Sequence, residues 1–108
     1  MEMHKRTGEN KKIVVKLDPE LAELIPTFLK NRNTDIQALH DSLKKENYEI
    51  VERIGHGMKG AGGGFGFDAI TEIGARIEKA AQEKNSDEVK NGIETLADYM
   101  KHVEVTYE

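Results

Sequence analysis

The sequence contains no cysteine and no tryptophan, and it has no long hydrophobic run. Without cysteine the protein has no disulfide, no thiolate metal site and no cysteine nucleophile. The lack of a long apolar run excludes a membrane-spanning helix. No charged start followed by an apolar stretch marks a signal peptide, so we expect a cytoplasmic protein. A chain of 108 residues has the size of one domain.

Acidic side chains outnumber basic ones beyond the first 12 residues. The chain has 16 Lys and Arg against 20 Asp and Glu, for a net charge of -4. Four of the basic and two of the acidic residues fall in residues 1–12, which leaves 12 basic and 18 acidic residues in the rest. An acidic body argues against a nucleic-acid binder, which needs a basic face for phosphate contacts. We predict a flexible polar tail over residues 1–12 and one folded domain over residues 13–108.

Apolar residues recur at steps of three and four through most of the chain, which is the spacing of one face of a helix. Four such stretches with short connections predict an all-α fold, an antiparallel up-down four-helix bundle. The β-rich stretch Ile13–Leu17 precedes them, but a single strand has nothing to pair with. The four stripes consist of Leu21, Leu24, Ile25, Phe28, Arg32, Ile36, Leu39 and Leu43, then Ile50, Val51, Ile54 and Met58, then Ile70, Ile73, Ile77 and Ala81, then Val89, Ile93, Leu96, Met100 and Val103.

Several polar residues predict where the helices begin. Asp18 followed by Pro19 is typical of an N-cap and a first-turn proline. The helical spacing of apolar residues continues past a second proline, Pro26. We therefore expect a kinked helix, or a short extra N-terminal helix that leads into a long one. The predicted starts of the remaining three helices are Asn47, Asp68 and Ser86.

Seven of the ten glycines lie within residues 55–66. Each glycine in a helix costs about 1 kcal/mol relative to alanine, so a helix that contains several needs a reason for them. We expect residues 62–66 to form a loop between two helices. Gly57 and Gly60 instead fall in phase with the second helix.

His56 is predicted to point to solvent from the middle of that helix. At about 100° per residue, it falls about 200° from Ile54 on the helical wheel, almost opposite the apolar stripe. Lys59 and Gly60 lie on the same side as His56. Neutral imidazole is a good nucleophile near pH 7, lysine supplies a point charge for phosphate oxygens, and a glycine lets a partner approach closely.

The segment His56-Gly57-Met58-Lys59-Gly60 resembles the H-x-x-K-G core of histidine-containing phosphotransfer (HPt) domains, the modules of bacterial two-component phosphorelays. The resemblance covers roughly residues 19–103. Two departures from the family pattern are Met58, where leucine is commoner, and the glycine-rich residues 62–64. The resemblance implies that His56 accepts a phosphoryl group on Nε2 from a receiver-domain aspartate and passes it to another receiver. It also implies that Lys59 steadies the phosphoryl oxygens and that Gly60 leaves room for the docking partner.

The same resemblance implies a phosphocarrier and not an enzyme with its own ATP site. Its partners would be receiver domains of response regulators or hybrid histidine kinases. No cofactor is expected on this chain, because the receiver supplies the magnesium site. We expect a monomer with no nucleic-acid or membrane partner.

The register of two antiparallel helices predicts a further site residue, Glu78. If the turn after the second helix centres near residues 65–67, the positions level with His56 lie between Gly74 and Glu78. Gly74 would let the helices close in, and Glu78 could reach the imidazole Nδ1, which fixes the tautomer and leaves Nε2 free. The family often has glutamine or glutamate at this place. The alternative is a solvated boundary residue paired with a lysine.

Other interpretations of the same residues are weaker. Residues 55–60 spell G-x-G-x-x-G, but a dinucleotide site needs a preceding strand. The histidines are scattered, so no metal site is expected, and we interpret Glu49 and Glu52 as ordinary surface. Two other functions remain open: a phosphoacceptor module cut from a longer chemotaxis-type histidine kinase, and a scaffold that is not phosphorylated. The start at Met1 and the complete bundle favour a free-standing carrier. The cognate kinase, the receivers, the direction of phosphoryl flow and the pathway output stay open.

Overall fold

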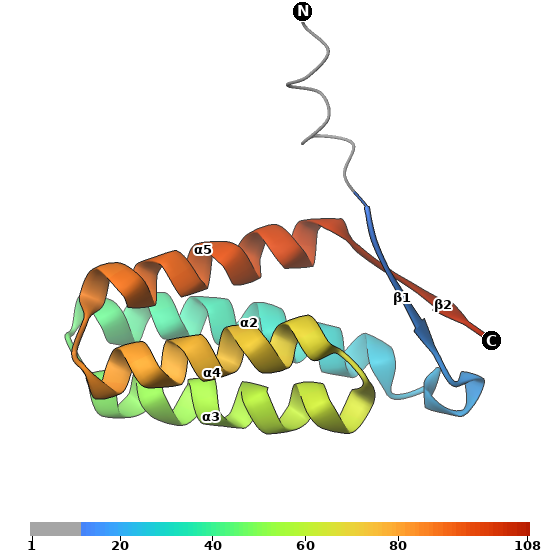
Figure 1. The fold of residues 1–108 in the computed structure, drawn as a ribbon, viewed down its shortest axis with the longest axis horizontal. Helices are drawn as coiled ribbons and strands as arrows, with labels where there is room; N and C mark the ends of the chain where they lie inside the picture. Colours follow the sequence, from blue (N-terminus) through green and yellow to red (C-terminus); the bar gives the residue numbers. More distant parts are fainter. Residues whose placement is uncertain (1–11) are drawn as a thin grey trace, which may run out of the picture.

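The computed structural model describes residues 12–108, which form a bundle of four α-helices and a two-stranded sheet (Figure 1). The predicted helical bundle is confirmed. The turns between successive helices lie at alternating ends of the bundle (Figure 1). In chain order the elements are β1 (Ile13–Leu17), the 3-10 helix η1 (Pro19–Leu21), α2 (Ile25–Lys44), α3 (Tyr48–Phe65), α4 (Asp68–Gln82), α5 (Ser86–His102) and β2 (Val103–Tyr107).

The two strands correct the all-α prediction. β1 and β2 pair in parallel, with Ile13 opposite Val103 and Leu17 opposite Tyr107. Ile13–Leu17 therefore has a partner, and Val103 begins a strand instead of continuing the last helix. The partner lies at the far end of the chain, so no local pattern around β1 could reveal it. The predicted tail over residues 1–12 lies outside the described residues except for Lys12.

The N-terminal region contains a single short turn where a kink or an extra helix was expected. Asp18 caps η1, because its side chain accepts a hydrogen bond from the Glu20 amide at 2.9 Å. η1 has only three residues, and α2 begins at Ile25 with Pro26 in its first turn. A proline there interrupts no helical hydrogen bond, so no kink is needed. Leu24, predicted to be in the core, is 53% exposed.

Three predicted helix starts are accurate to within one residue. Asn47 caps α3 as predicted and accepts a hydrogen bond from the Ile50 amide. The cap of α5 is Asn85, not Ser86. Asp68 is the first residue of α4 and not its cap. Caps and first-turn positions favour the same small polar residues, so composition alone does not separate them.

The helices bury a continuous apolar core, and the three phenylalanines gather at the end of the bundle near the sheet. Phe28 stacks on Phe67 with ring centroids 4.8 Å apart, and Phe65 packs at the same distance. The residues of this core with the lowest exposure include Leu39, Val51, Phe67, Ile70, Ile77, Val89, Ile93 and Leu96.

Residues 62–64 are helical, so the predicted loop is wrong. α3 continues to Phe65 and ends at Gly66, whose φ of 86° is the left-handed conformation of a helix C-cap. The reason is the close packing of α3 on α4. A Cβ on Gly62 would lie 2.7 Å from the Thr71 amide nitrogen, so only glycine fits at this crossing.

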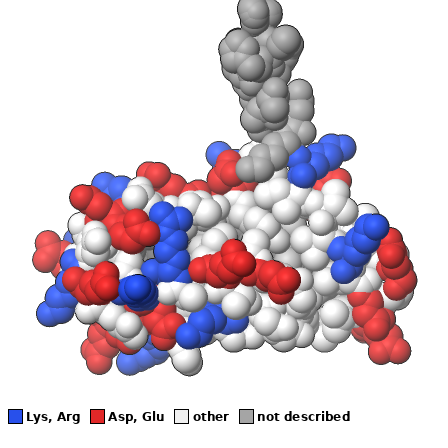
Figure 2. Space-filling view, in the orientation of Figure 1, with Lys and Arg blue, Asp and Glu red and all other residues white. Residues whose placement is uncertain are grey.

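No helix within residues 12–108 is both long enough and apolar enough to span a membrane. On the face drawn in Figure 2, Lys and Arg side chains alternate with Asp and Glu and form no continuous basic surface.

The glycines of α3 predict opposite effects of the same substitution. Gly64→Ala should stabilise the protein by up to about 1 kcal/mol, because nothing lies within 4 Å of the added Cβ. Gly62→Ala should destabilise it by about 1–3 kcal/mol, because the added Cβ meets the α4 backbone. Urea unfolding followed by circular dichroism measures both effects. Equal stability of the two variants would show that close packing does not explain Gly62.

Candidate functional site

His56 stands on the outer face of α3. Its side chain is 69% exposed, whereas Val51, Gly55 and Met58 of the same helix are buried. No hydrogen bond to Nε2 is found within residues 12–108. The structure therefore places His56 at the surface, as the helical wheel predicted, with one ring nitrogen open to a partner.

Glu78 of α4 contacts both His56 and Lys59. Its Oε2 lies 2.9 Å from His56 Nδ1, and its Oε1 lies 2.9 Å from Lys59 Nζ. The Glu78 side chain is only 15% exposed, so the carboxylate is held against α3. Both sequence interpretations of Glu78 describe part of this arrangement, since it reaches the imidazole and also pairs with a lysine. The direct link from Lys59 to Glu78 was not predicted.

The electrostatics of the Glu78 carboxylate set the tautomer of His56. The hydrogen bond from Lys59, and after it the one from His56, lowers the pKa of Glu78 below its usual value. Glu78 is therefore ionised at neutral pH and can only accept hydrogen bonds. In neutral imidazole the proton must then sit on Nδ1, which leaves the Nε2 lone pair facing solvent.

Three contacts between α3 and α4 fix this geometry. A Cβ on Gly74 would lie 2.6 Å from the Lys59 amide nitrogen, and one on Gly55 would lie 2.8 Å from that of Glu78. Thr71 Oγ1 also donates a hydrogen bond to the Lys59 carbonyl oxygen at 3.2 Å. The helices therefore lie almost backbone to backbone, and residue numbers that rise along α3 are matched by numbers that fall along α4.

The remaining predicted site residue, Gly60, lies one turn after His56 on exposed backbone. Nothing lies within 4 Å of a Cβ built at Gly60 or at Gly57. Packing therefore does not require glycine at either position, in contrast to Gly55 and Gly62. Their effect is to leave the surface beside His56 without side chains.

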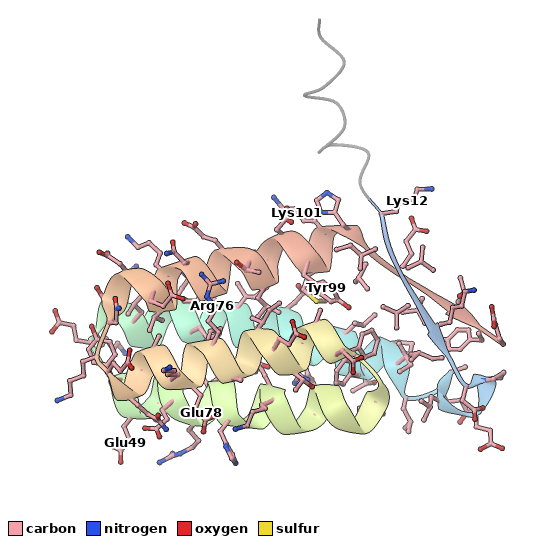
Figure 3. The ribbon with its side chains drawn as sticks, viewed as in Figure 1. Lys12, Glu49, Arg76, Glu78, Tyr99 and Lys101 are labelled. Atoms are coloured by element: carbon pink, nitrogen blue, oxygen red, sulfur yellow. The ribbon has the colours of Figure 1, made fainter. Side chains whose placement is uncertain are left out.

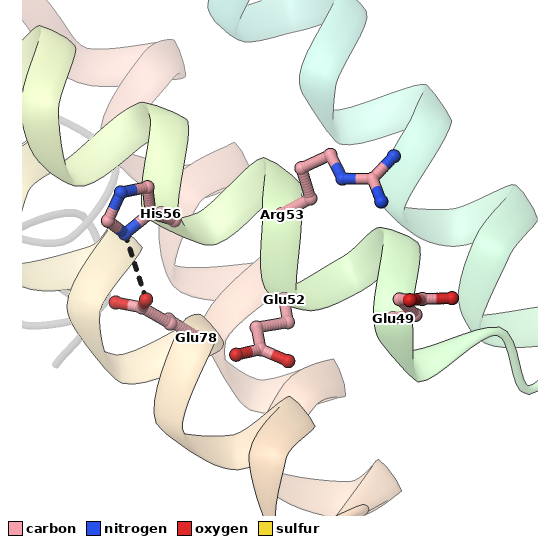
Figure 4. Close-up of a pocket in the computed structure, with 5 residues that line it drawn as sticks. All are labelled: Glu49, Glu52, Arg53, His56 and Glu78. Carbon is pink, nitrogen blue, oxygen red and sulfur yellow. Dashed lines mark hydrogen bonds and ion pairs between the residues drawn. The ribbon is translucent and has the colours of Figure 1, made fainter.

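A hollow of about 410 Å³ adjoins His56 on the side opposite Gly60, and it is lined by Glu49, Glu52, Arg53, His56 and Glu78 (Figure 4). Glu49 and Glu78 project from the same side of the bundle (Figure 3). Sequence reasoning treated Glu49 and Glu52 as ordinary surface, although their spacing of seven and four residues from His56 was a signal that they share its face. In the described part of the chain, no group of three or more potential ligands is arranged to hold a metal ion.

These residues can carry out nucleophilic chemistry at Nε2. The imidazole has a fixed tautomer, an ammonium lies nearby, and bare backbone follows one turn later. None of these features provides a nucleotide site. The arrangement suits a group that is delivered and removed by another molecule.

Comparison with known proteins identifies one matching family. The model of the Hpt domain family matches residues 23–105, which is most of the chain. The chain has no significant match among curated proteins or solved structures. The matched range includes α3, α4 and His56, whereas β1 and η1 precede it.

The contacts of Glu78 predict a pH-dependent contribution to stability. Because its pKa is lowered in the folded protein, the contribution is complete above the usual carboxyl range and is lost as pH falls through the lowered pKa. The stability difference between wild type and Glu78→Gln should therefore be largest near neutral pH and shrink on acidification. Urea unfolding at a series of pH values measures it.

The ring nitrogens of His56 provide a second test of the role of Glu78. Nitrogen-15 NMR should show the proton on Nδ1 in the wild type, and a shift toward the other tautomer in Glu78→Ala. An unchanged tautomer in Glu78→Ala would show that Glu78 does not set the protonation of His56.

Proposed function

Because the chain belongs to the Hpt domain family, whose members carry phosphoryl groups in phosphorelays, we propose that His56 is its phosphorylated residue. In this proposal the phosphoryl group arrives from the aspartyl phosphate of one receiver domain and leaves to the aspartate of another. The observation that carries the proposal is the pairing of His56 Nδ1 with Glu78, while the side chain is exposed and Nε2 has no hydrogen bond to any residue in 12–108. A scaffold that is not phosphorylated would need neither feature.

The transfer step needs no proton movement on this chain. The Nε2 lone pair attacks the phosphorus, an N–P bond forms, and the P–O bond to the receiver carboxylate breaks with its electrons going to that carboxylate. Nδ1 keeps its proton, so the ring becomes positively charged, and the ionised Glu78 beside it stabilises that charge. Transfer to the second receiver is the reverse of this step. The magnesium ion that assists it belongs to the receiver.

Lys59 and Gly60 support the step in different ways. An ammonium has three donors, and Glu78 takes one of them, so Lys59 can still reach a phosphoryl oxygen. Gly60 leaves space for the receiver to bring the phosphorus within about 3–3.5 Å of Nε2. Receiver domains are therefore the proposed partners, and this chain supplies the nucleophile and the docking face.

His56→Gln should abolish phosphoryl acceptance and leave the fold intact. Its side chain is exposed, so stability should change by no more than about 0.5 kcal/mol. The test incubates the variant with a receiver domain that carries labelled phosphate, and the label on the wild type should be acid-labile and base-stable. His40→Gln, an exposed histidine on α2, is the matched control and should keep the label. Label retained by His56→Gln would move the site elsewhere.

Gly60→Leu and Lys59→Ala should distinguish the access of the receiver to His56 from the charge that Lys59 supplies. Gly60→Leu should block transfer while the free energy of unfolding holds or rises, because leucine favours a helix and no atom lies within 4 Å of a Cβ at this position. Lys59→Ala keeps access and loses a charged donor, so transfer should slow about ten- to a hundredfold without stopping. Rapid-quench measurement of transfer rates distinguishes the two effects. Transfer by Gly60→Leu at the wild-type rate would show that the bare surface is not where the partner docks.

A further inference from the structure

The exposed face of α3 differs on the two sides of His56. Toward the N-terminus, Glu49, Glu52 and Arg53 precede His56 at seven, four and three residues and line the hollow beside it. Toward the C-terminus the same face has Gly60 and Gly64, and nothing lies within 4 Å of a Cβ on either. A partner centred on His56 therefore meets charged side chains on one side and bare backbone on the other.

The charges in the hollow are only partly satisfied by other residues of the range 12–108. Glu78 is neutralised by Lys59, and Glu52 accepts a hydrogen bond from the uncharged amide of Gln82 at 3.0 Å. Glu49 has no hydrogen bond or ion pair to any residue in 12–108. Arg53 extends away from Glu52 and Glu78 toward α2 (Figure 4). Within residues 12–108, the carboxylates of Glu49 and Glu52 are thus left without a neutralising cation.

We propose that this hollow receives a lysine or arginine side chain of the receiver domain and so fixes the orientation in which the receiver docks. The proposal rests on the proposed function, and it adds the chemistry of the partner. An aspartyl phosphate that approaches His56 brings negative charge toward a protein of net charge -4. A cation placed at Glu49 and Glu52 offsets that repulsion during the encounter.

The helix fixes where the cation must be on the receiver. Seven residues of α-helix separate Glu49 from His56, which is about 10 Å along the axis. The cation should therefore lie about 10 Å from the phosphorylated aspartate, on one side of it only. If the receiver docked in the opposite orientation, its cation would face Gly60 and Gly64, which have no carboxylate. The two glutamates would then face a part of the receiver without a cation. Such unpaired charge is how an interface rejects the wrong arrangement.

Charge reversal at Glu49 tests this inference. A panel of purified receiver domains is labelled with acetyl phosphate, and the receiver that transfers fastest to wild-type His56 is used throughout. Glu49→Lys should lower kcat/KM for transfer about tenfold at low ionic strength, because a lysine in the hollow repels the cation of the receiver as the two proteins meet. Added salt should shrink the difference.

Glu94→Lys is the matched control, because Glu94 is an exposed glutamate on α5 and the substitution changes the net charge equally. It should transfer like the wild type, and a lysine-to-glutamate or arginine-to-glutamate change on the receiver should restore transfer to Glu49→Lys. Equal losses in Glu49→Lys and Glu94→Lys, or no loss in either, would overturn the inference while labelled His56 still supported the proposed function. If no receiver labels His56, the proposed function fails and the inference fails with it.

Discussion

The close packing of α3 against α4 is the constraint on which the site depends. Gly55 and Gly74 let the two backbones meet, and this brings Glu78 to within hydrogen-bond distance of both His56 and Lys59. With larger residues at the crossing, the helices would separate and the carboxylate would withdraw from the imidazole. The glycines therefore act on the chemistry without contacting any reacting atom, through the distance between two helix axes.

Sequence reasoning succeeded where a local period or a fixed register carried the information. The outward direction of His56 follows from the helical wheel, and the contact with Glu78 follows from pairing positions across a short turn. It failed where the local structure depends on residues that lie elsewhere in the sequence. The loop predicted over residues 62–66 rests on the low helix propensity of glycine, whereas packing of Gly62 against Thr71 outweighs that preference and α3 continues to Phe65. The β1–β2 pair depends on residues from both ends of the described chain.

Glycine has two opposite roles within one helix here, and only the structure separates them. At Gly62 a side chain would collide with the next helix, so the residue serves the fold. At Gly60 a Cβ would meet nothing within 4 Å, so the fold does not require glycine there. Composition counts both as helix breakers, and the difference appears only when the neighbouring backbone is in place. The same holds for Glu49 and Glu52, whose shared hollow with Glu78 requires two helices to be placed together.

The parallel strand pair also has a consequence for the order in which the molecule assembles. Ile13 and Val103 are 90 positions apart, so their pairing closes nearly the whole described chain into one loop. Closing so long a loop costs much more chain entropy than forming the turns between adjacent helices. Packing of the helices brings the two strands close together, so pairing them costs far less chain entropy once the bundle has formed. The β1–β2 pair thus joins the two ends of the described chain, whereas the α3–α4 crossing that holds His56 is made by segments that are near neighbours in the sequence.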